Sequence, residues 1–368
     1  MKQMILPAIA HVWRFVTAAV RAAVNTFLEM LGSLVEFGER WLFSSKKALH
    51  GLAVTRILLG STAFGLLLAN FNTRLYTFGS GSAWNGELAE PRSDFVKIWL
   101  FSSFHRVAGN DVAFTALYVL LMILAVLFVL GWRFRLVLPV FFVLWVSFIE
   151  MNDMVGDQGD NMFRITLMIL FFTDPAAKWS LDARRRAKRE WFPPGTSGAY
   201  IGTVLHNLGL VALTAQVSFV YAAGGLYKAQ GQPWAGGWAV YDPLHTMRFG
   251  TWPVLSDLIT QWGPMVTIAT WGSIIIQVAF LLMLLSTFTR RIALIAILSF
   301  HIAIGVLMGL PWFSLTMIAI DSIFIREKSW ARLDAAARRL WRGTAPKEAA
   351  DGAGPVAASE VADAVGTR

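Results

Sequence analysis

The sequence predicts an all-α protein, a polytopic transmembrane helix bundle of about eight helices preceded by an N-terminal amphipathic interfacial helix. Of its 368 residues, 56% are hydrophobic and only 15% are charged, whereas soluble domains average roughly 25% charged residues. The apolar residues lie in blocks long enough to cross a hydrocarbon core of roughly 30 Å. Lysine and arginine concentrate in alternate connections between these blocks, as expected when positive charge stays on the cytoplasmic side.

Residues 1–48 are predicted to form an amphipathic segment at the cytoplasmic surface of the membrane. Charged side chains interrupt its apolar stretches, and no short apolar core leads to a small-residue cleavage site, so the pattern does not indicate a secretory signal peptide. The run 5–42 favours a helix that lies in the interface. A cytoplasmic helix packed on the bundle is the alternative.

Residues 49–326 carry eight apolar runs that predict the transmembrane domain. The predicted spans are 49–70, 111–131, 134–151, 161–175, 200–227, 264–286, 292–310 and 312–326. Arg56 interrupts the first span, and Arg164 lies near the start of the short fourth one. Residues 327–368 are expected to form a cytoplasmic tail, whose end is rich in alanine, glycine and aspartate and is predicted to be disordered.

Basic residues set the predicted orientation. With the N-terminus inside, 24 of the 32 lysines and arginines fall in cytoplasmic segments and 6 in outer ones, while Arg56 and Arg164 lie within spans. This asymmetry supports an even number of crossings, with both termini in the cytoplasm. We therefore predict a multi-pass protein of the plasma membrane, the inner membrane of a bacterium, with membrane lipids as its direct partners.

Composition also excludes several classes of function. The net charge of +9 does not predict nucleic-acid binding, because the basic residues flank apolar helices and there indicate orientation and headgroup contacts. The chain has no cysteine, which excludes disulfides, thiolate chemistry, iron–sulfur clusters and cysteine zinc sites. No internal repeat is visible, and this disfavours the inverted-repeat transporter folds.

The outer connection after the third span is acidic, with Glu150, Asp153, Asp157 and Asp160 close together. Carboxylate oxygens in such clusters can bind a hard cation, but the spacing is not that of an EF-hand. The favoured interpretation is that the acids are hydrated or pair with Arg164 around glycine turns. No metal site is predicted.

Lys228 ends the fifth span and is followed by a tryptophan-rich loop. On spacing alone, the favoured interpretation is a lysine that extends to the headgroups beside an interfacial aromatic belt. The functional alternative is that aromatic walls exclude water from the ammonium and favour the neutral amine, which can act as a base. The aromatic candidates for contact with a cofactor are Tyr227, Trp234 and Trp238. A close carboxylate such as Asp160 would oppose this chemistry by favouring the ammonium.

Polar side chains inside the predicted spans are costly, so each is a candidate for a site. They are His206, Gln216, Gln277, His301 and Asp321. Most such residues serve as interhelical hydrogen-bonding partners. His301 is the best functional candidate, because it falls in the middle of a span and could donate to a ligand headgroup or relay a proton.

The order of these features resembles the HTTM (horizontally transferred transmembrane) family, whose membrane module is shared with the vitamin K-dependent gamma-carboxylase. The resemblance covers most of residues 51–326, and the lysine segment is its most specific part. The segments that carry it are 152–160 leading into Phe171-Phe172-Thr173, Gly225-Leu226-Tyr227-Lys228 with Trp234 and Gly237, and 277–280 followed by Arg290, Arg291 and Phe300-His301.

In the gamma-carboxylase, the matching lysine is implicated as the base when vitamin K hydroquinone is oxygenated, a reaction that drives carboxylation of glutamate in a peptide. The resemblance therefore implies that Lys228 is a base and that the cofactor is a reduced quinone of the vitamin K type. Asn152 and His301 are the further catalytic candidates, and His301 is also a candidate for cofactor contact.

Two departures from the carboxylase narrow this expectation. The carboxylase has an Asn-His pair in its outer connection, whereas here Asn152 is followed by Asp153. Its large lumenal domain also has no counterpart in the short predicted tail. We therefore expect an oxidase-like or carboxylase-like redox or modifying enzyme rather than a full carboxylase.

A non-catalytic membrane factor is the rival from a different class. The resemblance extends to bacterial proteins associated with the maturation of secreted toxic peptides. It therefore also implies a secreted peptide as partner at the outer face. Transport ranks third.

Overall fold

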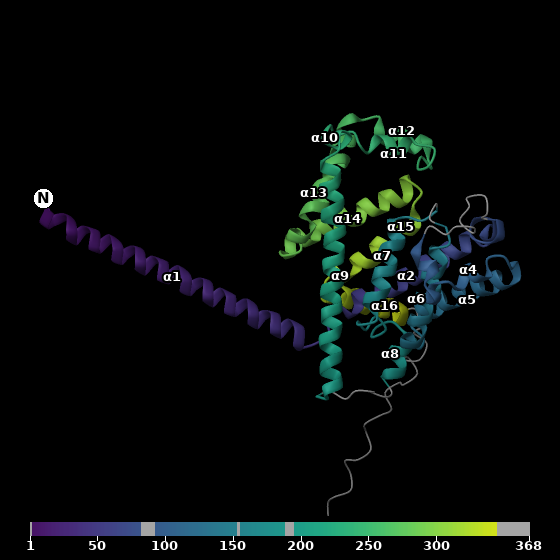
Figure 1. The fold of residues 1–368 in the computed structure, drawn as a ribbon, viewed down its shortest axis with the longest axis horizontal. Coiled ribbons are helices and arrows are strands. Elements are labelled where there is room, and N and C mark those ends of the chain that lie inside the picture. Colours follow the sequence, from purple (N-terminus) through teal and green to yellow (C-terminus); the bar gives the residue numbers. More distant parts are fainter. Residues whose placement is uncertain (1, 82–92, 153–154, 188–194, 344–368) are drawn as a thin grey trace, which may run out of the picture. The chain divides into compact units, whose positions relative to one another are not determined.

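The computed structural model describes residues 2–81, 93–152, 155–187 and 195–343, and all regular elements in these ranges are helices (Figure 1). This confirms the all-α prediction. The chain divides into two units, Met1–Glu327 and Lys328–Arg368. Asp153 of the acidic connection and the tail segment predicted to be disordered lie outside the described residues.

Each of the eight predicted spans coincides with a helix, and five of these helices are long enough to cross a bilayer. The five are α2 (Leu49–Ala69), α5 (Asp111–Leu130), α9 (Ser197–Ala229), α13 (Gly263–Met283) and α14 (Thr287–Leu307). At 1.5 Å per residue, a helix of about 20 residues reaches the roughly 30 Å of the hydrocarbon core. The described residues contain a sixth stretch of this kind, Thr17–Phe43.

Three helices at predicted spans are shorter: α6 (Phe134–Ile149), α7 (Gln158–Leu170) and α15 (Pro311–Asp321). Their 16, 13 and 11 residues correspond to about 16–24 Å of helix, less than the hydrocarbon thickness. A 3₁₀ turn, η4 (Ser322–Phe324), continues α15. The predicted count of eight crossings is therefore approximate.

The remaining helices lie before, between or after these eight in the sequence. They are α1 (Lys2–Phe43), α3 (Arg74–Thr77), η2 (Asp94–Lys97), η3 (Trp99–Phe101), α4 (Ser103–Val107), α8 (Leu181–Arg186), α10 (Gln232–Ala235), α11 (Tyr241–His245), α12 (Pro253–Thr260) and α16 (Glu327–Gly343). Figure 1 shows α10, α11 and α12 grouped at the C-terminal end of α9. Two hydrogen bonds tie this group to α13, from the Val240 N–H to Thr270 Oγ1 and from Trp271 Nε1 to the Trp234 carbonyl.

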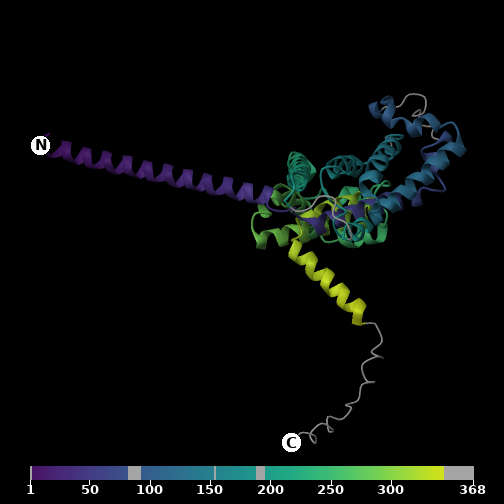
Figure 2. The same cartoon turned by 90° about the horizontal axis from the view of Figure 1, so that it is seen from below.

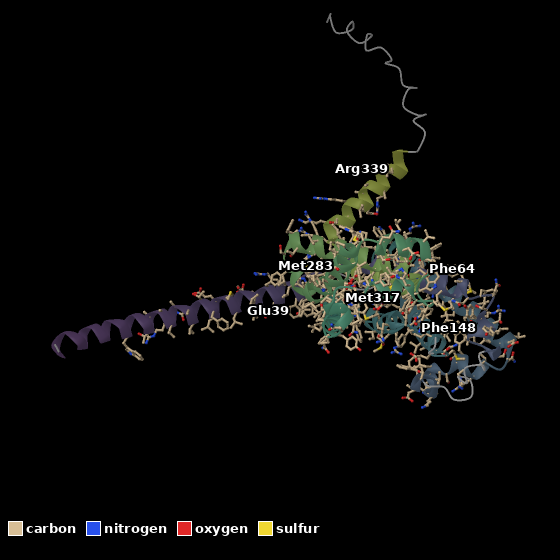
Figure 3. The ribbon with its side chains drawn as sticks, turned by 90° about the horizontal axis from the view of Figure 1, so that it is seen from above. Glu39, Phe64, Phe148, Met283, Met317 and Arg339 are labelled. Atoms are coloured by element: carbon tan, nitrogen blue, oxygen red, sulfur yellow. The ribbon has the colours of Figure 1, made fainter. Side chains whose placement is uncertain are left out.

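Helix α2 packs against both α5 and α15 and forms the centre of the core. A Cβ atom added at Gly60 would lie 2.6 Å from Val129 Cγ2, so only glycine fits this close contact between α2 and α5. The Tyr118 hydroxyl of α5 donates to the Leu67 carbonyl of α2 at 2.7 Å. Figure 3 shows Phe148 and Met317 within the same packed part of the molecule, and both are buried.

Arg56, the charge inside the first predicted span, is fully buried and caps a helix end. Its guanidinium donates to the Phe128 and Val129 carbonyls at the C-terminus of α5, and to the Pro175 and Trp179 carbonyls of a following connection. The last carbonyls of a helix lack partners within the helix, and a cation there also interacts favourably with the helix dipole. The buried arginine therefore has a structural role.

Helix α1 is one unbroken helix (Figure 2). At about 100° per residue, its charged side chains from Arg21 to Arg40 fall within roughly 100° of the helix circumference, and the apolar side chains of Phe27 and Leu34 on other faces are exposed. This distribution is that of an amphipathic helix. Placement of α1 in the membrane interface stays a prediction.

Candidate functional site

Lys228 lies in the last turn of α9, and its side chain is directed to two neighbouring helices. Its Nζ donates to Gln277 Oε1 of α13 at 2.7 Å. The same atom lies 5.1 Å from the ring centroid of Trp234 and 5.2 Å from that of Phe300 on α14. Ring faces attract cations at this range. The ammonium is thus held by an amide oxygen and two aromatic faces.

Gly225 allows this arrangement. A Cβ atom at this position would lie 2.7 Å from Val278 Cγ2 and 3.3 Å from the Ile274 carbonyl oxygen of α13. A larger side chain would separate α9 from α13 and move Lys228 away from Gln277. The glycine of the Gly-Leu-Tyr-Lys segment therefore positions the lysine one turn later.

The environment of Lys228 suits a group that gains and loses a proton. Within the described residues, no carboxylate pairs with this lysine. A carboxylate at hydrogen-bonding distance would stabilise the ammonium strongly, whereas an amide oxygen and aromatic faces do so more weakly. This environment is compatible with the neutral amine, and the role of Lys228 as a base stays a prediction.

His301 on α14 belongs to a buried chain of hydrogen bonds. Its Nε2 lies 3.0 Å from the hydroxyl oxygen of Tyr221 on α9, and that hydroxyl donates to Asp321 Oδ2 of α15 at 2.6 Å. The exposed fractions are 1% for His301 and Tyr221 and 0% for Asp321. The rings of Phe300 and Phe313 pack around the imidazole at 5.2 and 5.7 Å between centroids.

The lysine and the histidine chain both make contacts between the same pair of helices, α9 and α14. Lys228 and Tyr221 are seven residues apart on α9 and so lie on the same helix face, two turns apart. Phe300, whose ring faces Lys228, directly precedes His301 on α14. The structure therefore brings together four residues of the predicted sets, Lys228, Gln277, His301 and Asp321. Tyr221 was missed, because a tyrosine in an apolar span carries no polar signal; its spacing to Lys228 was the available clue.

Of the three aromatic residues predicted to contact a cofactor, one lies against Lys228 and two are exposed. Trp234 covers Lys228, and its carbonyl accepts from Trp271 Nε1 at 3.1 Å. Trp238 and Tyr227 are 46% and 81% exposed. Their roles in binding a cofactor stay predictions.

The acidic connection has partners of its own. Glu150 pairs with Arg164, and Asp157 and Asp160 form a reciprocal capping box at the start of α7. Burial raises the pKa of Asp157 above its ordinary value, against the opposing effect of backbone N–H groups. These contacts agree with the favoured interpretation of the acids as structural. Among the described residues, no group of carboxylates and histidines could hold a metal ion.

Asn152 is buried beside the acidic connection, and its Nδ2 donates to the Thr77 carbonyl at 2.7 Å. This contact links the connection to α3 and does not involve Lys228. A catalytic role for Asn152 stays a prediction.

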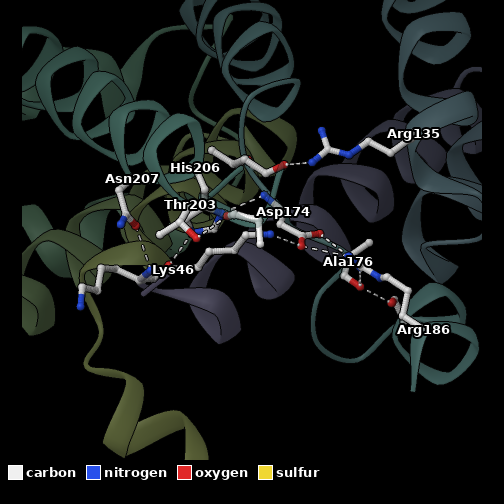
Figure 4. Close-up of polar contacts among 12 residues, drawn as sticks. Lys46, Arg135, Asp174, Ala176, Arg186, Thr203, His206 and Asn207 are labelled. Atoms are coloured by element: carbon white, nitrogen blue, oxygen red, sulfur yellow. Dashed lines mark hydrogen bonds and ion pairs between the residues drawn. The ribbon is translucent and has the colours of Figure 1, made fainter. Parts of the chain in front are cut away.

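His206 belongs to a separate polar cluster (Figure 4). The Asp174 N–H donates to its Nδ1 at 3.0 Å, and its Nε2 lies 2.8 Å from the Lys47 carbonyl oxygen. Asp174 also pairs with Lys46 and Arg186, each at 2.9 Å. Both imidazole nitrogens thus have backbone partners that fit the neutral ring, so His206 joins the α1–α2 and α7–α8 connections to α9.

The comparisons with known proteins agree with this architecture. A family described as "HTTM domain" matches residues 46–330, close to the predicted membrane domain at 49–326. The "Uncharacterized protein YitO" of Bacillus subtilis (strain 168) is 26% identical over 208 residues, which are 54% of this chain and 63% of that protein. No solved structure matches. Because the family match covers well over half of the chain and includes Lys228, His301 and Asp321, this integral membrane protein belongs to the HTTM domain family.

Proposed function

We propose that this protein is a membrane enzyme that binds a quinol beside α9, α13 and α14 and uses Lys228 as a base. The observation that carries the proposal is the position of Lys228 Nζ, which is held by the Gln277 amide and two ring faces with no carboxylate among the described residues. A lysine that served only to anchor the helix would extend to water or headgroups.

The residues present suit a flat aromatic ligand with hydroxyl groups. The faces of Trp234 and Phe300 can stack on a ring, and the Gln277 amide can exchange hydrogen bonds with a hydroxyl. His301 adds a buried Nδ1 atom that has no partner among the described residues. Leu226 on α9 and Ile275 on α13 are more than half exposed and provide apolar surface for an isoprenoid tail.

When bound, a quinol of the vitamin K type would supply acidic hydroxyl groups and two electrons for dioxygen. Lys228 in its neutral form would accept a hydroxyl proton at Nζ, and Gln277 would orient the amine through its Oε1 atom. The rings of Trp234 and Phe300 would exclude water from this atom. Exclusion of water keeps the amine from being protonated by solvent.

Replacement of Lys228 by arginine tests the base. We expect Lys228→Arg to lose at least about 100-fold in oxygen-dependent quinol consumption in lipid nanodiscs, the range typical of a general base, with thermal stability preserved. Arginine keeps the positive charge but stays protonated at physiological pH. Lys178→Arg, in a loop distant in sequence, is the matched control. Equal turnover by Lys228→Arg and the wild type would return Lys228 to the role of an anchor.

A second candidate function is a non-catalytic factor for the maturation or export of a secreted peptide. One observation favours it: the segment with α11 and α12 exposes large apolar side chains, among them Met247, Val254 and Leu258. An exposed apolar patch of this kind can bind a peptide or enter the lipid headgroup region. This candidate gains support if the purified protein carries no quinone.

A further inference from the structure

The hydrogen-bonded chain His301–Tyr221–Asp321 has an unpaired polar atom at each of its two ends. His301 Nδ1 and Asp321 Oδ1 are both buried without a hydrogen-bond partner among the described residues. Buried polar atoms are almost always paired in folded proteins, and an unpaired one costs roughly 1–3 kcal/mol. A purely structural bridge between three helices has no reason to leave both of its ends unsatisfied.

The hydrogen-bond directions follow from the charge on Asp321. When this carboxylate is ionised it only accepts, so the Tyr221 hydroxyl donates to Asp321 Oδ2. In that state the tyrosine oxygen accepts from His301 Nε2, which carries the ring proton. His301 Nδ1 is left with a free lone pair, on a ring that packs against Phe300 and Phe313.

We propose that His301, Tyr221 and Asp321 form a proton relay that accepts a proton from a phenolic or quinol hydroxyl bound at His301 Nδ1. Uptake at Nδ1 is coupled to transfer of the Nε2 proton to the Tyr221 oxygen and of the Tyr221 hydroxyl proton to Asp321 Oδ2. One proton enters, the imidazole exchanges its tautomer, and Asp321 becomes a neutral carboxylic acid. Tyr221 and Asp321 act through His301 and are positioning residues.

The inference rests on the proposed function in its choice of ligand. As a quinol loses two electrons to dioxygen, both of its hydroxyl protons leave it, and the reduced dioxygen takes them up as hydrogen peroxide. Lys228 in its neutral form can hold one of these protons in transit. The relay provides a second proton acceptor in a part of the bundle from which water is excluded. The accepted proton neutralises the Asp321 carboxylate, and the buried imidazole stays uncharged.

The proton order of the resting relay can be measured without any ligand, by ¹⁵N NMR of the histidine rings in nanodiscs. We expect the Nε2–H tautomer for His301 in the wild type, with the signal assigned through His301→Gln. In Asp321→Leu, the Tyr221 hydroxyl loses its carboxylate and turns to His301 Nε2, so the ring should adopt the Nδ1–H tautomer. In Tyr221→Phe/Asp321→Leu this inversion should disappear. An unchanged tautomer in Asp321→Leu overturns the relay.

The ligand step is tested with menadiol, the reduced form of 2-methyl-1,4-naphthoquinone. Binding, followed by quenching of tryptophan fluorescence, should produce an infrared carbonyl band of a protonated carboxylic acid. The band should be absent in Asp321→Leu and in Tyr221→Phe, although Tyr221→Phe still binds menadiol. Tyr118→Phe, another buried tyrosine that bonds to a neighbouring helix, should keep the band.

The two experiments separate the two proposals. Menadiol binding without the carboxylic acid band contradicts proton uptake by the relay, whereas the proposed quinol site survives. Failure of the wild type to bind menadiol contradicts the proposed quinol function and the ligand class assigned to His301. The tautomer of Asp321→Leu still decides whether the three residues form a relay.

Discussion

The hydrogen-bond partners of Lys228 and His301 differ from those of the other polar residues in the membrane helices. The sequence contains several such residues, and they differ in how many of their polar atoms are hydrogen-bonded. His206 has a backbone partner for each ring nitrogen, and Arg56 donates to four carbonyls. His301 Nδ1 has no hydrogen-bond partner among the described residues. Residues whose polar atoms are all hydrogen-bonded stabilise the fold. A residue with an unpaired polar atom still has a donor or acceptor that a ligand could use.

The two histidines allow a matched comparison. We expect His301→Gln to lose most quinol consumption at nearly unchanged stability, because glutamine can hydrogen-bond to Tyr221 but cannot carry a proton through the ring. His206→Gln should instead lower the free energy of unfolding by about 1–2 kcal/mol, because one glutamine cannot reproduce both backbone bonds, with activity retained. Turnover and thermal unfolding are measured on the same nanodisc samples. The reverse pattern would exchange the roles assigned to the two residues.

At the scale of the helix, the sequence is informative about where a span lies and less so about where it ends. Apolar runs predicted all eight positions, because the bilayer imposes a length on them. The fourth span was expected at 161–175, whereas α7 covers Gln158–Leu170. The capping box of Asp157 and Asp160 starts the helix earlier, and Arg135 of α6 binds the carbonyls of Phe171 and Thr173 beyond its end. These are tertiary or capping contacts that hydropathy does not record.

The candidate site could be predicted only in part for the same reason. Lys228 and His301 are conspicuous in apolar segments, and the resemblance to the HTTM family singled out the lysine. Tyr221 was missed, since only its spacing to Lys228 was visible in the sequence and its carboxylate partner lies 100 residues later in the chain. Asn152 was a catalytic candidate, and its Nδ2 donates to the Thr77 carbonyl of α3. Pairings between distant helices are set by packing, which a single sequence does not specify.

Two glycines of α9 test whether helix packing positions the lysine. Gly225→Ala places a methyl group 2.7 Å from Val278 Cγ2, so we expect a loss of about 1–3 kcal/mol in stability from overpacking and reduced quinol consumption as Lys228 moves from Gln277. Gly202→Ala is the control, because nothing lies within 4 Å of its added Cβ. That variant should be neutral or slightly stabilising through helix propensity. Equal effects of the two substitutions would show that the contact between α9 and α13 does not position the site.

At the scale of the whole molecule, the predicted orientation places the start of α7 and the α10–α12 group outside, and α8 inside. The chain has no cysteine, so single cysteines can be labelled without background. A cysteine at Gln158 should react with an impermeant maleimide added to intact cells, and one at Arg185 should react only after permeabilisation. Labelling of Gln158→Cys only from the cytoplasmic side would invert the topology.

A quinol bound where Lys228, Gln277 and Trp234 meet should remain with the purified protein, and quantification of the lipids extracted from that protein measures it. Mass spectrometry of the extract should find close to one quinone per wild-type chain. Trp234→Ala removes one ring face at the lysine and should lose most of that quinone, whereas Trp252→Ala, an exposed tryptophan before α12, should retain it. No quinone in the wild type, or equal amounts in Trp234→Ala and Trp252→Ala, would rule out a quinol site at Lys228.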